Sequence, residues 1–404
     1  MTTLSSHACF MLSGFMRPQY NKNPIRSIDS LCDALRVSEV VLRHTAENIQ
    51  HHYTPYSIPK ANGKTRVVHI PSLHLKTIQK RINKEIFSHI TYPDYLYGGI
   101  EGKDYVKNAN AHAGANVLIA LDVKDFYPSI KREHVTDVYQ HLCNFSKDVA
   151  ELLTDLTTLR ERVPQGACTS SHLANLVLHK VEYPVVQNLR NQDFRYTRLL
   201  DDICISASKF LSPAKIETII SDVARMLKSK ELRLHPKKKS ITSKNNPESL
   251  MEVTGLWLNR GHARAKREER RAIRTEVYRC EKEAARSRYS PEYHKMHGSV
   301  SGRVAKLNYL HHPEAKNFRL RLQEILPLYD EHEIIKTSKI ASVLSKVAKA
   351  DRAKHWFAIQ HHKAQYRVNI VGRTNVKMAS KLSRQLSLCR PPKTLSELIY
   401  DEPI

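Results

Sequence analysis

The chain has 404 residues, of which 41% are hydrophobic and 26% charged, which is ordinary for a globular protein of two or three domains. Its 65 Lys and Arg against 40 Asp and Glu give a net charge of +25, which indicates a polyanionic partner. Nucleic acid is a better candidate for this partner than an anionic membrane, because no basic amphipathic helix stands out in the sequence. Seven cysteines without a C-x-x-C pair exclude a zinc ribbon, and no run of roughly 18 apolar residues occurs. We expect a soluble, cytoplasmic protein with no membrane partner.

The first 90 residues predict short helices followed by a basic hairpin. Ser27 and Ser38 are candidate N-caps before apolar residues at helical spacing, so one or two helices open the chain. The segment 57–72 (SIPKANGKTRVVHIPS) places the turn signal Asn62-Gly63 between extended runs. Residues 73–87 then repeat apolar positions at helical spacing, with Lys and Arg on the outer face.

Three acids lie at the ends of predicted strands in the middle of the chain. The run 117–130 (VLIALDVKDFYPSI) is apolar up to Asp122 and is stopped by Pro128, which is typical of a buried central strand. Residues 163–182 begin with a Pro and Gly turn and continue as a helix. The stretch 195–206 (RYTRLLDDICIS) predicts a hairpin with Asp201 and Asp202 at its tip. A helix over 212–229, a lysine cluster at 234–240 and a short strand at 252–259 follow.

If these two segments pair, three carboxylates meet at one edge of a sheet. Two carboxylates about 4 Å apart repel by about 1 kcal/mol in water and about 4 kcal/mol at an effective dielectric near 20, so a cation is expected between them. Carboxylate oxygens suit Mg²⁺, and two such ions can activate a hydroxyl and stabilise a leaving pyrophosphate. An Asp-Asp pair at a turn is more often a plain β-turn. The order of the elements favours a nucleotidyl transferase.

This ordered set of motifs resembles the reverse transcriptases, and within them the bacterial retron type. The retron-like marks are an N-A-x-x-H match at 108–112 and a V-T-G match at 253–255. The motifs shared with reverse transcriptases in general are IPKANGKTRVVHIPSLHLKTIQ (58–79), LDVKDFYPSI (121–130), VPQGACTSSHLANL (163–176), RYTRLLDDICIS (195–206) and LHPKKKS (234–240). Together the matches span roughly residues 55 to 260.

The resemblance implies an α+β fold, a right-hand polymerase whose antiparallel palm sheet is backed by helices. The implied segments are an N-terminal helical segment (1–55), fingers and palm (56–260), a helical thumb (261–330) and a basic C-terminal extension (331–404). It implies RNA-directed DNA synthesis from deoxynucleoside triphosphates, with a cognate structured non-coding RNA as template. The product would be DNA joined to RNA (msDNA), made in anti-phage defence beside an effector protein.

The resemblance also assigns roles to individual residues. It makes Asp122, Asp201 and Asp202 the catalytic ligands of two Mg²⁺ ions. The implied nucleotide-binding residues are Lys64, Arg66, Tyr127, Gln165, Gly166 and Lys238, with Lys239 as an alternative to Lys238. The implied nucleic-acid-binding residues are Asn108, His112, Val253, Thr254 and Gly255. For His112, structural support of the template channel remains open beside direct contact with RNA.

One departure from the family's pattern concerns the residues before the acid pair. The family usually has Tyr-Ala there, whereas this chain has Leu199-Leu200. Because both acids remain, we expect activity with altered primer placement or fidelity. Two alternatives stay open: another defence-associated or intron-type reverse transcriptase, and a catalytically silent RNA-binding scaffold with the polymerase fold. Three clustered acids without a metal argue against the scaffold.

Overall fold

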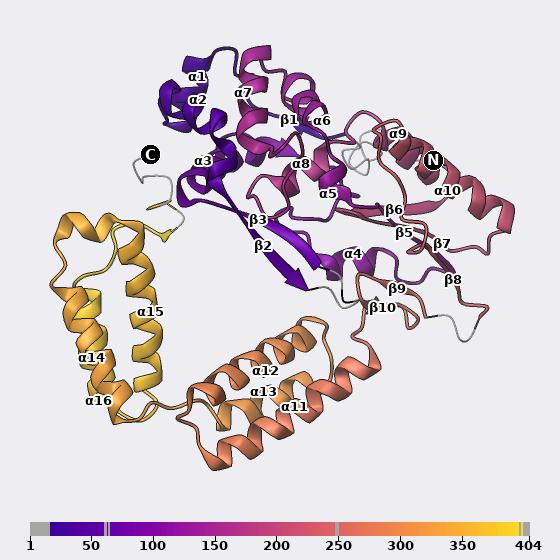
Figure 1. Cartoon of the computed structure of the whole chain (residues 1–404). Helices are drawn as coiled ribbons and strands as arrows, with labels where there is room; N and C mark the ends of the chain where they lie inside the picture. Colours follow the sequence, from indigo (N-terminus) through magenta and orange to yellow (C-terminus); the bar gives the residue numbers. More distant parts are fainter. Residues whose placement is uncertain (1–16, 60–62, 64, 247–249, 396, 399–404) are drawn as a thin grey trace, which may run out of the picture. The chain divides into compact units, whose positions relative to one another are not determined.

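The structure is a computed structural model that describes residues 17–59, 63, 65–246, 250–395 and 397–398. The chain divides into two compact units between Ala263 and Arg264 (Figure 1). This boundary lies three residues from the expected start of the thumb at residue 261. The two units are described separately below.

A four-stranded antiparallel sheet forms the centre of the first unit. Its strand order is β6-β7-β5-β8. The strands are β5 (Val117–Asp122), β6 (Phe194–Leu199), β7 (Asp202–Ala207) and β8 (Ser240–Ser243). β5 is almost wholly apolar because it lies between β7 and β8 and is covered by packed side chains. In this register Asp122 lies directly opposite Asp202.

Helices enclose this sheet in one continuous hydrophobic core. Ile203 and Ile205 of β7 share that core with Val186 and Val223, which come from the helices before and after the β6–β7 hairpin in the chain. The helices of the unit are α1 (Ile28–Leu35), α2 (Glu39–Glu47), α3 (Leu73–Glu85), α4 (Tyr105–Ala111), α5 (Phe126–Ser129), α6 (Arg132–Asp137), α7 (Lys147–Thr157), α8 (Ser170–Leu176), α9 (Glu182–Arg190) and α10 (Pro213–Lys228). Together, helices and antiparallel sheet confirm the predicted α+β class.

Three two-stranded pairs complete the first unit. The predicted basic hairpin is formed by β2 (Tyr53–Pro59) and β3 (Thr65–Pro71), and most of its predicted turn, including Asn62, lies outside the described residues. β1 (Gln19–Tyr20) pairs with β4 (Ile90–Thr91). β9 (Glu252–Val253) and β10 (Leu256–Trp257) form a tight hairpin at the V-T-G residues.

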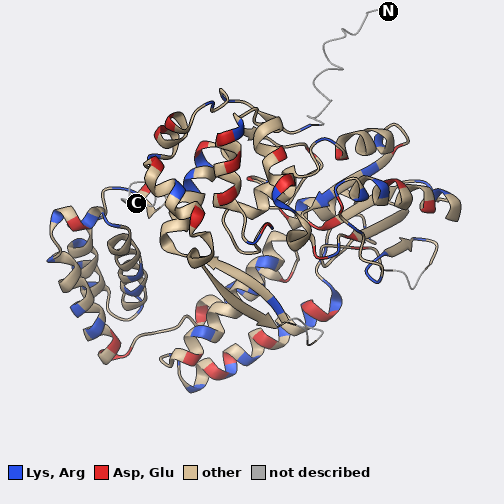
Figure 2. Cartoon of the chain, turned by 45° about the horizontal axis from the view of Figure 1, so that its top comes forward, with Lys and Arg blue, Asp and Glu red and all other residues tan. Residues whose placement is uncertain are grey.

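The second unit is helical throughout its described part. Its helices are α11 (Arg267–Arg286), α12 (Pro291–Tyr309), α13 (Ala315–Glu324), α14 (Glu331–Ser345), α15 (His355–Val371) and α16 (Val376–Ser387). The last three share a small core that includes Phe357, Val368 and Leu382. In Figure 2 these three helices carry more Lys and Arg than Asp and Glu, as expected from the sequence. Among the described residues, no helix combines the length and apolar character needed to cross a membrane.

Three predicted boundaries differ from the structure. The central strand ends at Asp122, not at Pro128, because Asp125 takes a left-handed conformation (φ 44°) and α5 begins after it. The helix expected to continue to residue 182 ends at Leu176, before α9 begins. The hairpin loop is Leu200-Asp201, not Asp201-Asp202, since Asp202 already pairs with Leu199. The third change places Asp202 inside the sheet, opposite Asp122.

Candidate active site

The structure brings Asp122, Asp201 and Asp202 to one end of the sheet. Asp122 is the last residue of β5, and Asp202, the first residue of β7, is its cross-strand partner. The loop between β6 and β7 is fixed to β5, because the amide of Val123 donates to the carbonyl oxygen of Asp201 at 2.9 Å. The convergence predicted from the sequence is therefore present, and neighbouring strands position all three acids.

Burial and the charges of neighbouring acids raise the pKa values of Asp201 and Asp202. The pKa of Asp202 is raised to about 6, first by burial and then by the charges of Asp201 and Asp122. Burial, followed by the charge of Asp122, also raises the pKa of Asp201. The Nζ atom of Lys238 lies 2.6 Å from Oδ2 of Asp122, and this hydrogen bond raises the pKa of the lysine. One ammonium group does not offset three carboxylates.

The donor set fits divalent cations. Three carboxylates at the ends of adjacent strands offer only hard oxygen ligands. Burial and the neighbouring acids raise the pKa values of Asp201 and Asp202. The ammonium group of Lys238 already forms an ion pair with Asp122, so positive charge is stabilised at this carboxylate. Asp122, Asp201 and Asp202 would hold the ions.

The predicted nucleotide-binding residues surround the acids from two further elements. Nε of Arg66, on β3, donates to Oε1 of Gln165 at 2.6 Å. The amide of His69 donates to the carbonyl of Gln165 at 2.7 Å, which ties the turn before α8 to the same strand. Gly166 has φ +111°, and a Cβ there would lie 2.9 Å from the carbonyl oxygen of His69. Only glycine fits this close approach without displacing the backbone.

Tyr127 and Lys238 are the other predicted nucleotide-binding residues that the structure describes, whereas Lys64 lies outside the described residues. Tyr127 on α5 is half-buried, and its pKa is raised to about 12, first by burial and then by the charge of Asp201, while Arg66 opposes the shift. The phenol therefore feels the charges of both Asp201 and Arg66. Of the two lysines left open by the sequence, Lys238 makes the contact with Asp122.

The retron-like motifs pack against each other instead of standing free. Oγ1 of Thr254, in the turn between β9 and β10, donates to the carbonyl of Tyr105 at 3.0 Å. Thr254 has φ +48° and Gly255 has φ +81°, the paired positive angles of a tight hairpin turn. The amide of Ala263 donates to Oδ1 of Asn110 at 2.8 Å. The two motifs therefore form one surface of the first unit.

Three of the residues expected to bind nucleic acid are buried in this arrangement. His112 lies between the hydroxyls of Ser206 and Thr197, both 2.7 Å from its ring nitrogens, and burial lowers its pKa to about 3. Val253 is buried, and the buried side-chain amide of Asn108 has no hydrogen-bond partner among the described residues. A nucleic-acid role for these residues stays a prediction. Structural support is the role of His112 that this environment favours.

Leu200, part of the Leu199-Leu200 departure from the family's pattern, and Gly98, which the sequence did not single out, shape the loop that carries Asp201. Leu200 has φ +59°, a left-handed conformation that a leucine rarely adopts. Its side chain lies against Gly98, where an added Cβ would meet Cγ of Leu200 at 2.4 Å and its backbone nitrogen at 2.9 Å. Gly98 and Leu200 are about a hundred residues apart, so no local pattern indicates that they touch.

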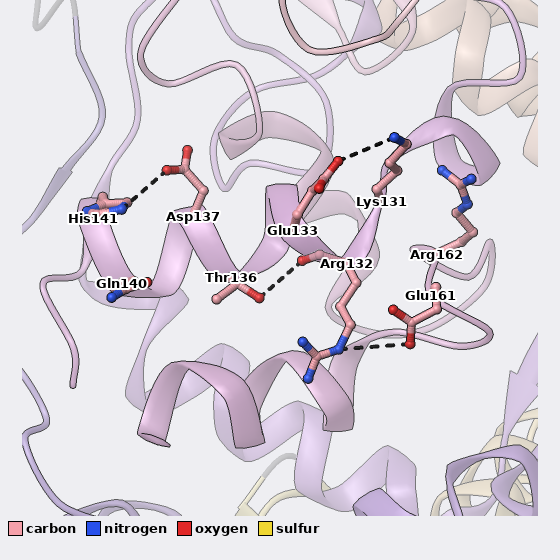
Figure 3. A pocket seen from close by; sticks show the side chains of 9 residues that line it. All are labelled: Lys131, Arg132, Glu133, Thr136, Asp137, Gln140, His141, Glu161 and Arg162. Atoms are coloured by element: carbon pink, nitrogen blue, oxygen red, sulfur yellow. Dashed lines mark hydrogen bonds and ion pairs between the residues drawn. The ribbon is translucent and has the colours of Figure 1, made fainter. Parts of the chain in front are cut away.

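A separate pocket of about 500 Å³ lies on α6 and the loop after α7 (Figure 3). Figure 3 shows its charged side chains turned toward one another: Arg132 is 3.9 Å from Glu161, and Lys131 is 3.4 Å from Glu133. Behind it, the ligand atoms of Glu133, His134 and Glu231 lie within 4.8 Å of one another, but Lys131 is 2.7 Å from Glu231. The lysine already neutralises these acids, so the pocket carries no second site.

Comparison with known proteins agrees with the geometry. Residues 58–273 match the family model described as reverse transcriptase (RNA-dependent DNA polymerase). The chain is 36% identical to Retron Se72 reverse transcriptase of Salmonella heidelberg, over 93% of this chain and 100% of that protein. It is 30% identical to Retron Ec48 reverse transcriptase of Escherichia coli, over 92% of this chain and 94% of that protein.

Among solved structures, telomerase from Candida albicans with a fragment of telomeric RNA aligns at 11% identity and a TM-score of 0.38, over 88% of this chain and 65% of that one. The assignment rests on the sequence relatives, which cover nearly the whole chain. The chain therefore belongs to the reverse transcriptase family and is an RNA-directed DNA polymerase of the retron type.

Proposed function

We propose that the chain copies a cognate structured non-coding RNA into DNA, with Asp122, Asp201 and Asp202 holding two Mg²⁺ ions. Family membership brings an RNA template and dependence on a divalent metal in general. The finer proposal rests on the position of three carboxylates at the ends of β5 and β7. Among the described residues, the one ion pair that these carboxylates make is with Lys238. When bound, two such cations activate the attacking hydroxyl and neutralise the leaving pyrophosphate.

The side chains around the acids are suited to bind a deoxynucleoside triphosphate. Arg66 offers a planar guanidinium to phosphate oxygens, and its bond to Gln165 fixes the direction of that group. Lys64 is a second candidate for the same phosphates. The family pattern makes Tyr127 the aromatic ring that excludes a ribose 2′-hydroxyl. It places Gly166 in the lining of the nucleotide pocket, and the missing Cβ of Gly166 allows its close approach to the carbonyl of His69. Lys238, which pairs with Asp122, would be the lysine near the departing pyrophosphate.

The RNA contacts are assigned to the surface formed by the two retron-like motifs. The turn of half-buried Thr254 and exposed Gly255 is the part of that surface open to a ligand, while Asn108, His112 and Val253 are buried. The product of the enzyme is DNA joined to RNA, and its synthesis is primed from an internal 2′-hydroxyl of the same RNA. The basic extension 331–404 binds the RNA or an effector protein, and the system acts in anti-phage defence.

Purification with the co-expressed nucleic acid tests the enzymatic part. Wild type is expected to carry a DNase-sensitive species linked to RNA, and a variant with Asp201→Ala and Asp202→Ala is expected to carry RNA alone. Identical RNA on both proteins, with no DNA on either, would instead support the silent scaffold. Sequencing the DNA separates the retron type from other defence-associated or intron-type enzymes, because only a retron DNA maps to one adjoining RNA template.

Plaque counts test the role in defence. Cells that express the full locus are compared with cells that carry the Asp201→Ala and Asp202→Ala variant and with cells whose chain ends at residue 330. Loss of protection in both would support the proposal. Full protection and intact partner binding without residues 331–404 would show that the extension has no part in defence. Protection by the alanine variant would show that defence does not need DNA synthesis.

A further inference from the structure

A buried arginine stands directly behind the loop that carries the acids. The side chain of Arg198, on β6, is 0% exposed. Its Nε lies 2.5 Å from Oε1 of Glu182, and its Nη2 lies 2.8 Å from Oε2 of the same carboxylate. The hydroxyl of Tyr196 donates to Oε1 at 2.8 Å. The ion pair is therefore bidentate, and it is shielded from solvent on all sides.

The remaining three N–H groups of Arg198 all donate to main-chain carbonyls. Nη1 donates to Ala174 at 3.1 Å and to Leu200 at 3.2 Å, and Nη2 donates to Asn175 at 2.9 Å. A guanidinium has five N–H groups, so every donor of this side chain is used. Ala174 and Asn175 lie in the last turn of α8, where carbonyls lack partners within the helix and favour a cation.

We propose that Arg198 is a positioning residue that fixes the loop Leu200-Asp201 and thereby the carboxylates of Asp201 and Asp202. It joins the carbonyl immediately before Asp201 to the end of α8, the helix that follows the nucleotide-binding turn. The inference rests on the proposed role of the two aspartates as cation ligands. It adds a group that touches neither cation nor substrate, yet sets where the ligands stand.

The loop needs such support because its conformation is unfavourable on its own. Leu200 adopts φ +59°, which persists only where the surroundings determine it. The main chain of Arg198 adds two bonds, from its amide to the carbonyl of Tyr95 and from the amide of Tyr97 to its own carbonyl, both 2.9 Å. Gly98 follows at once and receives the side chain of Leu200. Arg198 is thus the residue through which three separate segments define one loop.

The test separates positioning from stability. Removing Arg198 alone leaves Glu182 buried and unpaired, which can unfold the protein. The main variant is therefore Arg198→Met with Glu182→Gln, because glutamine is neutral and still accepts from Tyr196. Arg198→Lys is the second variant, since it keeps the charge but offers three donors without a planar fork. Each is measured for melting temperature, Mn²⁺ binding by electron paramagnetic resonance, and primer extension against Mg²⁺ concentration.

A buried arginine elsewhere in the first unit provides the matched control. Arg81 on α3 is 4% exposed, and its Nη1 donates to the carbonyls of Leu35 at 3.1 Å and Arg36 at 2.8 Å. Arg81→Met also removes a buried guanidinium from main-chain carbonyls, but from carbonyls of α1. It is expected to lower the melting temperature and to leave the Mg²⁺ concentration for half-maximal activity unchanged.

The expected result is a change in metal dependence without loss of fold. The Arg198→Met and Glu182→Gln variant should need at least about tenfold more Mg²⁺ for half-maximal primer extension and bind Mn²⁺ correspondingly more weakly. A folded variant with wild-type Mg²⁺ and Mn²⁺ dependence would overturn the inference. If the variant does not fold, Arg198→Lys decides by the same two measurements. Unchanged Mn²⁺ binding by Asp201→Ala with Asp202→Ala would instead refute the proposed ligands themselves.

Discussion

Two clusters of charge meet at the hairpin of β6 and β7, where Arg198 lies three residues before Asp201, and they differ in how completely they are neutralised. In the first, Glu182 and Arg198 meet through two charge-assisted bonds, and every donor of the arginine is used. In the second, Asp201 and Asp202 make no ion pair within the described residues, and Asp122 contacts an exposed lysine. Complete neutralisation holds the backbone in place, whereas the deficit of positive charge leaves a site for cations.

The largest effect should come from removing charge from the deficient cluster. Asp202→Asn keeps the shape of the side chain but removes an anionic ligand, so single-turnover primer extension should fall about 10³-fold, which corresponds to about 4 kcal/mol. The same change should raise the free energy of unfolding at pH 7.5 without metal, by about 1 to 2 kcal/mol, because a carboxylate with a raised pKa destabilises the folded state when ionised. Glu182→Gln, the matched change in the neutralised cluster, should lower stability instead. If both substitutions raised, or both lowered, the free energy of unfolding, the two clusters would not differ in their neutralisation as described.

The contact between Gly98 and Leu200 is the next place to disturb the loop. Gly98→Ala would place a methyl group 2.4 Å from Cγ of Leu200, and such overpacking costs about 1 to 3 kcal/mol. We expect lower stability and a marked loss of DNA synthesis, measured by chemical unfolding and primer extension. Adding Leu200→Ala should restore part of both, because the backbone nitrogen of residue 200 remains 2.9 Å away. No rescue by the second change would show that the side chain of Leu200 is not the obstacle.

The sequence predicts the deficient cluster better than the neutralised one, for physical reasons. Asp122, Asp201 and Asp202 interrupt apolar runs at strand ends, so alternation and turn chemistry place them together. Arg198 instead has the appearance of a solvated strand residue, because its partners come from α8 and α9 and no local pattern shows that it points inward. The same holds for Gly98, whose need to be glycine comes from Leu200 alone.

The retron-like motifs show a related limit. Matching residues to a family motif locates Asn108, His112 and Val253 on one surface, but it does not show which side chains face outward. The structure buries these three and exposes Gly255. Burial depends on packing between distant segments: α4 meets the hairpin of β9 and β10 about 150 residues later, and His112 lies between side chains of β6 and β7.

The pH dependence of stability offers a finer comparison of metal-free and metal-bound protein. Asp202 has a folded pKa of about 6, above its value of 3.8 in a model compound, so the folded state binds more protons than the unfolded state between these values. Metal-free stability should therefore fall as pH rises from about 4 to about 6. Mg²⁺ competes with these protons, so it should raise the melting temperature more at pH 7.5 than at pH 5. An equal shift at both pH values would contradict cation binding at these carboxylates, and Asp202→Asn should reduce the difference.

The smallest effect on function is expected at His112, whose polar groups are fully satisfied like those of the Glu182 and Arg198 cluster. Its two ring nitrogens meet Ser206 and Thr197, and its pKa is lowered to about 3, so the ring stays neutral throughout the physiological range. His112→Ala leaves two buried hydroxyls without partners and should lower the free energy of unfolding by about 1 to 3 kcal/mol. Affinity for the cognate RNA, measured per folded molecule, should stay within about twofold of wild type. A large loss of RNA affinity with unchanged stability would assign His112 to direct recognition, because a side chain that only joins β6 to β7 acts on binding through the fold.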